Sequence, residues 1–199
     1  MKTVAIITVT SPKVFSWLGH MPVMSWSVTQ LLEVRGISRI VCAAVKDLAK
    51  RARDLLVKED DDIPTVTIPD SVLKQDRLDK WLVAADGPAA DADVIALVQP
   101  TFPFLPSAKI EGCIDLVGRN FADTACTAQE VNAWTSYGRG RAYAEVLGCC
   151  VYAPARVKEK KEKSYGRFRP VLVSLIESLD VTDADNHRLA KALVADGSM

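Results

Sequence analysis

The sequence predicts an α/β fold: a mainly parallel, doubly wound (Rossmann-like) sheet in three layers, with helices on both faces. Two observations carry this prediction. Short apolar runs rich in β-branched residues, typical of buried parallel strands, alternate with segments whose apolar residues recur at helical spacing. These segments follow one another as strand and helix up to Asn120, an order that favours right-handed crossovers within one sheet.

The elements of this first part are bounded by prolines, glycines and capping residues. The expected strands are 2–10, 37–44, a short strand within 60–70, and 93–98. The expected helices are 23–35, 46–59, 71–86 and 107–120. Gly36 follows the first helix as a natural stop, and Asp70 or Ser71 is placed to cap the third. Residues 11–22 are expected to form a loop, because two prolines and a glycine interrupt them.

The pattern changes after Asp123. Strands are expected at 123–131 and 147–155, on either side of a turn-rich stretch, and a last strand is expected at 172–177. The basic stretch 156–169 is interpreted as a solvated hairpin or loop, and 182–196 as a closing helix capped by Thr182 or Asp183. No linker divides the chain, so we expect one domain over 1–199, with 123–170 as a small β-rich insertion.

The composition excludes several function classes. Lys plus Arg equals Asp plus Glu at 25 each, so no overall field favours nucleic acid or an anionic membrane. No apolar run is long enough for a membrane span and no signal peptide is evident, so we expect a soluble, cytoplasmic protein. The five cysteines are odd in number and form no C-x-x-C pair, so we expect reduced core residues rather than disulfides or zinc ligands.

Common nucleotide and hydrolase motifs are absent. The chain has no G-x-G-x-x-G after its first strand, no P-loop and no G-x-S-x-G, and its two histidines build no nucleophile–base pair. Ligands of open parallel sheets bind beyond the carboxyl ends of the strands. The segments where a site is expected are therefore 8–13, 43–47, 99–105 and the neighbourhood of Asp180.

Four segments in order resemble the CMP-sugar synthetases, the acylneuraminate and Kdo cytidylyltransferase family. They are "GHMPVMSWSVTQLLEVRGISRIVCAA", "DADVIALVQPTFPFLPSAKIEGCIDLV", "LGCCVYAPARVKEKK" and "ESLDVTDADNHRLAKALV". Together they span nearly the whole chain. The resemblance implies a nucleotidyltransferase that moves a nucleoside monophosphate from CTP to a sugar acid or related small-molecule acceptor, with release of pyrophosphate. It also implies Mg²⁺ on the phosphates and a homodimer made through the region 123–170.

The resemblance assigns roles to residues at the expected strand ends. Gln99 and Thr101 match the family's sugar-side motif and would bind substrate. Asp180 matches the first metal-site aspartate and would be catalytic, with Asp183 as the nearest second metal ligand. The family's second aspartate falls on Thr182 instead. At the end of the second strand only Asp47 is left as an acid.

The largest departure is the front loop. The family's phosphate loop carries a Gly-Ser-Lys cradle, and this chain has "TVTSPKVFSWLG", which is shorter and holds one lysine. Thr10, Ser11 and Lys13 are the candidate nucleotide contacts, with Lys13 as a catalytic phosphate contact; a solvated lysine in an ordinary turn is the alternative. Arg139 and Arg141 are candidate compensating contacts from the arm.

Two functions therefore stay open. The first is a divergent nucleotidyltransferase that uses Lys13, Gln99 and Asp180. The second is a catalytically impaired protein of the same fold that acts as a binding or regulatory partner. The second rests on Phe102 and Leu105, which stand where the family has a serine and an arginine, and on the lost phosphate cradle, because each lost contact weakens transition-state stabilisation.

Overall fold

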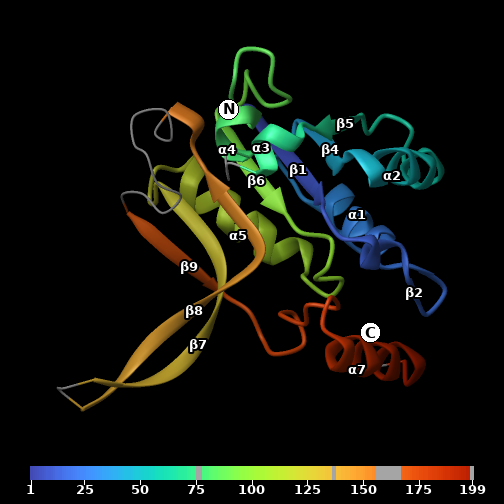
Figure 1. The fold of residues 1–199 in the computed structure, drawn as a ribbon. Coiled ribbons are helices and arrows are strands. Elements are labelled where there is room, and N and C mark those ends of the chain that lie inside the picture. Colours follow the sequence, from blue (N-terminus) through green and yellow to red (C-terminus); the bar gives the residue numbers. More distant parts are fainter. Residues whose placement is uncertain (75–77, 136–137, 156–166, 198–199) are drawn as a thin grey trace.

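The structure is a computed structural model that describes residues 1–74, 78–135, 138–155 and 167–197. Its centre is a seven-stranded sheet in the order β5-β4-β1-β6-β8-β7-β9 (Figure 1). The strands are β1 (Thr3–Val9), β4 (Arg39–Val45), β5 (Thr65–Ile68), β6 (Val94–Val98), β7 (Thr124–Thr135), β8 (Gly138–Tyr152) and β9 (Phe168–Leu172). Neighbouring strands of this sheet pair in parallel, except that β8 is antiparallel to both β6 and β7. The predicted mainly parallel α/β fold is confirmed.

Helices cover both faces of the parallel half. They are α1 (Val23–Glu33), α2 (Lys46–Glu59), α3 (Asp70–Lys74), α4 (Leu78–Leu82) and α5 (Ser107–Gly118). Alternate residues of β1 point to opposite faces: Ala5 and Ile7 belong to the core that α1, α2 and α5 cover, and Val4 and Ile6 belong to the core under α3 and α4. Every residue of β1 is buried, which explains its continuous apolar run.

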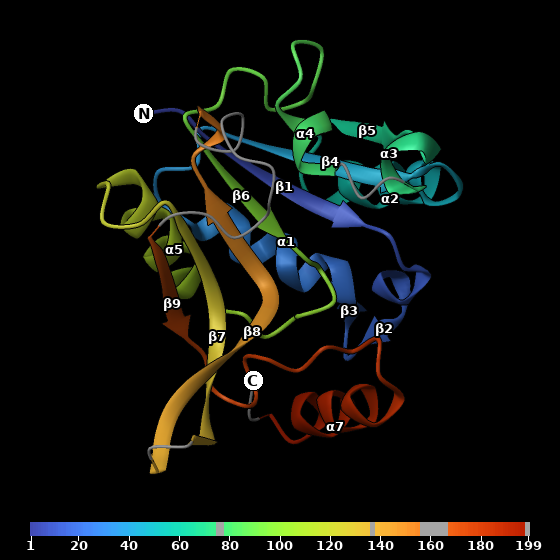
Figure 2. The same cartoon turned by 60° about the vertical axis from the view of Figure 1, so that its left-hand side comes forward.

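A third, smaller core forms at the carboxyl edge of the sheet. The final helix α7 (Ala184–Ala195) lies beside the short strands β2 (Trp17–Leu18) and β3 (Met21–Pro22), as Figure 2 shows. Leu18, Phe104 and Val181 are buried together there. The expected loop 11–22 therefore contains a 3₁₀ helix, η1 (Pro12–Phe15), and a small hairpin, with Gly19 in the left-handed region at φ 66°.

Three expected elements differ. The turn-rich stretch 132–145 lies mostly within β7 and β8, which form a long hairpin that projects from the sheet (Figure 1). The last strand is β9, four residues earlier than expected; 175–178 is a turn in which Glu177 and Ser174 bond each other's backbone N–H groups. The third expected helix appears as α3 and α4, separated by residues outside the described part of the chain. Most of the expected basic loop, residues 156–166, also lies outside it.

The cysteines divide into two groups. Cys126 and Cys150 are register partners on β7 and β8 and form a disulfide, so the expectation of five reduced cysteines is wrong for this pair. It failed because the hairpin register, which sequence spacing does not reveal, sets the two directly opposite. Cys42, Cys113 and Cys149 are free and buried, as expected. Burial raises the pKa of Cys42 to about 12 and keeps it a neutral core thiol.

Candidate functional site

The turn after β6 forms one wall of the candidate site. The N–H of Gln99 donates to the carbonyl of Gly148 (2.9 Å), and the N–H of Phe102 donates to the carbonyl of Gln99 (3.3 Å). Thr101 is 6% exposed, and its hydroxyl makes no hydrogen bond within the described part of the chain. Gln99 is half-buried at the carboxyl edge, where the sequence predicted a substrate contact.

The segment before α7 is tied to this turn. The N–H of Val181 donates to the carbonyl of Thr101 (2.9 Å), which sets Asp180 beside the turn after β6. One carboxylate oxygen of Asp180, Oδ1, accepts from both the N–H (2.9 Å) and the hydroxyl (2.8 Å) of Thr182. Thr182 thus orients Asp180 and leaves its other oxygen, Oδ2, without a bond in the described residues.

Gln99 and Asp180 line one cavity of about 320 Å³. The remaining lining residues come from the turn after β6, from β8 and from the segment before α7: Phe102, Glu145, Val146 and Ser178. Two predicted site residues that stand far apart in the sequence thus share one cavity at the carboxyl edge. The cavity is large enough for a sugar-sized ligand.

Glu145 and Ser178 were missed by sequence reasoning. Glu145 falls in the stretch interpreted as turns, and Ser178 lies in the segment "ESLDVTDADNHRLAKALV", to which the resemblance assigned roles only from Asp180 onward. The place of Glu145 depends on a register shift in the hairpin: Cys126 pairs with Cys150 but Ala128 pairs with Glu145. Such bulges re-aim side chains and are common beside active sites. No local sequence signal indicates Glu145, whereas Ser178 stands two residues before Asp180, in a neighbourhood where a site was expected.

A side-chain hydroxyl stabilises this bulge. Thr127 lies opposite the extra residues of β8; its hydroxyl donates to the carbonyl of Val146 (2.6 Å) and accepts from the N–H of Cys149 (3.1 Å). The nearby Ser178 hydroxyl donates to the carbonyl of Leu175 (2.9 Å) and accepts from Gln129 Nε2. The wall that carries Glu145 and Ser178 is therefore held by specific bonds.

The front segment lies outside the cavity lining. Thr10 and Lys13 are exposed, and Ser11 caps η1 by accepting from the N–H of Lys13 (3.3 Å). Phe15 is buried and carries the guanidinium of Arg51 on its ring, 4.4 Å from the ring centre. The loop thus takes its shape from apolar packing and local caps, unlike a glycine-rich phosphate cradle.

Lys13 instead lies near the start of α7. Asp183 caps this helix by accepting from the N–H groups of Asp185 (2.9 Å) and Asn186 (3.0 Å), as one of the two expected caps. These backbone donors hold the pKa of Asp183 below its ordinary value, and Arg188 and Lys13 add to this. Lys13 and Asp183 are therefore electrostatic neighbours, and neither lines the cavity.

His187, on the first turns of α7, faces the same region. Burial lowers its pKa most, and the positive charges of Lys191 and Lys13 lower it further, against a hydrogen bond to the backbone of Trp17. The imidazole is therefore expected to be neutral near pH 7. Its hydrogen bond to the backbone of Trp17 connects α7 to β2, which is a structural role.

Three other candidates lie elsewhere. Asp47 is in the exposed first turn of α2, at the carboxyl edge but outside the cavity lining. Arg139 and Arg141 belong to β8 and pair with Trp134 and Asn132 of β7, but their side chains lie outside the described part of the structure.

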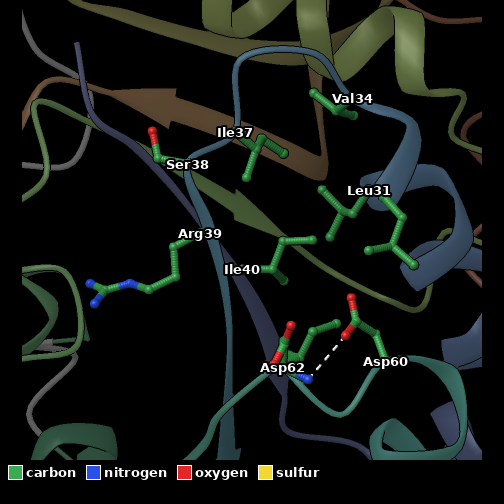
Figure 3. Close-up of a pocket in the computed structure, with 10 residues that line it drawn as sticks. Leu31, Val34, Ile37, Ser38, Arg39, Ile40, Asp60 and Asp62 are labelled. Atoms are coloured by element: carbon green, nitrogen blue, oxygen red, sulfur yellow. Dashed lines mark hydrogen bonds between the residues drawn. The ribbon is translucent and has the colours of Figure 1, made fainter.

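A second cavity, of about 300 Å³, opens where α1 ends and β4 begins (Figure 3). Leu31, Val34, Ile37 and Ile40 form its apolar side, and Asp60 and Asp62 lie at its lower rim in the view. The carboxylates of 60–62 lie within 4.8 Å of one another. This cavity lies at the amino end of β4, away from the residues that the sequence singled out.

The fold is similar over nearly its whole length to solved structures of cytidylyltransferases. The 4-diphosphocytidyl-2C-methyl-D-erythritol synthase of Anaerococcus prevotii superposes with a TM-score of 0.69 at 14% identity, covering 98% of this chain and 96% of that one. A CMP:2-keto-3-deoxy-manno-octonic acid synthetase complexed with CTP gives 0.70 at 12% identity, with 99% and 100% covered. Another 4-diphosphocytidyl-2C-methyl-D-erythritol synthase gives 0.69 at 14% identity, with 97% and 99% covered.

No protein-family model and no curated protein sequence matches the chain. The structural similarity confirms the predicted cytidylyltransferase-like fold, and the low identity fits a divergent chain. Among the described residues, the helices are too short or too polar to cross a membrane.

Proposed function

We propose that the protein is a cytidylyltransferase-like nucleotidyltransferase. Its acceptor hydroxyl would attack the α-phosphorus of CTP, the bond to the β-phosphate oxygen would break, pyrophosphate would leave and the hydroxyl proton would pass to water. One observation carries the proposal: Gln99 and Asp180, singled out by the resemblance, line the same cavity at the carboxyl edge. The resemblance gives a sugar acid or related hydroxyl compound as the acceptor class, which the cavity lining narrows below.

The proposed roles follow from the polar or charged group that each residue could offer to a ligand. Gln99 offers an amide to the acceptor side, and Lys13 is the proposed phosphate contact, with Thr10 and Ser11 in the same segment. The carbonyl of Thr101 accepts from the N–H of Val181 and so supports the turn that carries Gln99, and a substrate contact by its hydroxyl stays a prediction. Arg139 and Arg141 remain candidate contacts from the arm. The homodimer and the cytoplasmic location remain predictions.

A divalent metal fits this site if one or two carboxylates hold it together with substrate phosphates and water. Asp180 and Asp183 each have one carboxylate oxygen that accepts no hydrogen bond from the described residues. Mg²⁺ is often held by one or two protein carboxylates together with substrate phosphates and water. Asp180, with Asp183 as its neighbour, would hold the ion, which when bound neutralises charge on the triphosphate.

Thermal-shift titration with CTP, ATP, GTP and UTP, with and without Mg²⁺, tests the proposal. We expect CTP with Mg²⁺ to stabilise the full chain by about 2.7 kcal/mol at a hundred times its dissociation constant. Asp180→Asn should abolish the Mg²⁺-dependent part of the shift. The matched control is Asp185→Asn, because Asp185 is exposed and its side chain bonds Arg188. No shift with any nucleotide at millimolar concentration would refute the proposal.

A catalytically impaired binding protein of the same fold is the second candidate. Phe102 and Leu105, which replace polar family residues, are 7% and 3% exposed and pack against Gly148. In the front loop, Val14, Phe15 and Leu18 are likewise buried and pack in the core. A CTP shift without pyrophosphate release from any acceptor would favour this candidate, and pyrophosphate release above the rate without protein would exclude it.

A further inference from the structure

The 320 Å³ cavity defined above has a charge pattern that bears on the acceptor. Its lining contains the two carboxylates of Glu145 and Asp180, the amide of Gln99 and the hydroxyl of Ser178. No cation is among these lining residues, and Lys13 is not one of them. A ligand in this cavity therefore meets negative charge and hydrogen-bond acceptors.

Glu145 carries most of this pattern. Within the described part of the chain its carboxylate makes no hydrogen bond and no ion pair, so both oxygens are free to accept. The bulge opposite Thr127 fixes its backbone, because the hydroxyl of Thr127 bonds both Val146 and Cys149. If Asp180 serves the metal, Glu145 is the charged group left for the acceptor.

The other polar groups are partly used. The hydroxyl of Ser178 donates to the carbonyl of Leu175 and accepts from Gln129, so it can offer a ligand one lone pair at most. Asp180 keeps one unbonded oxygen. Gln99 alone among the lining residues supplies a free donor, and one amide does not neutralise a carboxylate.

We propose that the acceptor presents hydroxyl or ammonium donors, and no negative charge, to Glu145. The acceptor is thus a polyol or amino-bearing hydroxy compound rather than a sugar acid. Donor groups on such a ligand satisfy the free, exposed carboxylate of Glu145, whereas a ligand carboxylate would be repelled by it, and no lining residue in the described part of the chain supplies a compensating cation. This inference deepens the proposed function and rests on it, since it names the substrate class of the same site. Glu145 is the specificity-determining residue.

The test uses three six-carbon probes that differ in charge: D-glucosamine, D-sorbitol and D-gluconate. Binding of each to the full chain is measured by ligand-observed NMR, and pyrophosphate release is measured with CTP and Mg²⁺. We expect glucosamine and sorbitol to bind at least about tenfold more tightly than gluconate, and Glu145→Gln to reduce that ratio about tenfold, because the carboxylate is the charge that discriminates. Glu33→Gln, an exposed glutamate of α1 outside the lining, should keep the wild-type ratio.

The outcomes separate the two proposals. If gluconate binds as well as the other probes, or if Glu145→Gln leaves the ratio unchanged, the inference is overturned even when CTP binds. If no nucleotide binds, the proposed function fails, and the probe-binding arm still decides whether the cavity rejects an anion. Preference for glucosamine and sorbitol that is lost in Glu145→Gln supports the inference, and pyrophosphate release with the same preference supports both proposals.

Discussion

The front segment, residues 10–22, and the wall of the 320 Å³ cavity stand at the same edge of the sheet but use their polar groups differently. In the front segment, Ser11 caps η1 and the hydroxyl of Ser16 donates to the carbonyl of Lys13 (2.6 Å). Both side chains therefore hydrogen-bond to the nearby backbone. In the cavity wall, Glu145 has no partner among the described residues and Asp180 keeps a free oxygen.

This difference shows where polar side chains keep hydrogen-bonding capacity that the protein itself does not use. Polar groups that satisfy their own backbone define structure, and groups with free capacity in a cavity are available to a ligand. The front segment is mainly a packing element. The cavity wall carries Gln99, Asp180 and Glu145, whose side chains keep free hydrogen-bonding capacity among the described residues. Substitutions in the two regions should therefore affect different properties.

The largest expected effect is on the packing of the front segment. Leu18 is 0% exposed and packs with Phe104 and Val181 beneath α7. Leu18→Ala removes buried methyl groups and leaves a cavity, so we expect a loss of about 2–5 kcal/mol in the free energy of unfolding, measured by urea denaturation.

The neighbouring residue provides the control. Trp17 is 62% exposed, so Trp17→Ala should cost less than about 1 kcal/mol despite the larger side chain that is lost. Equal losses for the two variants would mean that the front segment is not organised by the small core under α7.

An intermediate effect is expected where the cavity wall meets β8. A Cβ at Gly148 would lie 3.2 Å from Cγ of Phe102 and 3.3 Å from Cδ2 of Leu105, so Gly148→Val overpacks this contact. We expect a loss of about 1–3 kcal/mol, measured by urea denaturation. Because Phe102 lines the cavity, the variant should also weaken binding of the acceptor probes.

Gly112 of α5 is the matched glycine. A Cβ there would meet the nearest atom of Val171 at 3.6 Å, an ordinary contact, and alanine favours a helix more than glycine does. Gly112→Ala should leave stability unchanged or raise it. If it destabilised the protein as much as Gly148→Val, close packing at Gly148 would not be the cause.

The sequence predicted the parts that depend on local order. The continuous apolar run of β1 and the helical spacing of 46–59 predicted their elements closely, and Asp183 was one of two expected caps. The carboxyl-edge rule and the resemblance together singled out Gln99 and Asp180, which line one cavity.

The remaining features depend on register, which local patterns do not encode. The stretch 132–145 is rich in turn-forming residues, yet pairing across the hairpin makes most of it strand. The disulfide of Cys126 with Cys150 and the position of Glu145 at the cavity both follow from that pairing. Each is fixed by partners far away in the sequence.

The smallest expected effect concerns the cap of α7. The backbone N–H groups of Asn186 and Asp185 lower the pKa of Asp183, so its carboxylate contributes stability above the unfolded-state pKa of about 4, and this contribution is lost as pH falls through the lower folded-state pKa. Urea midpoints of wild type and Asp183→Ala should differ equally at pH 7 and pH 5 and should converge at pH values below about 4. Asp185→Ala, which removes an exposed partner of Arg188, is the control and should change the midpoint less. A difference between wild type and Asp183→Ala that grew toward acid pH would contradict the capping role.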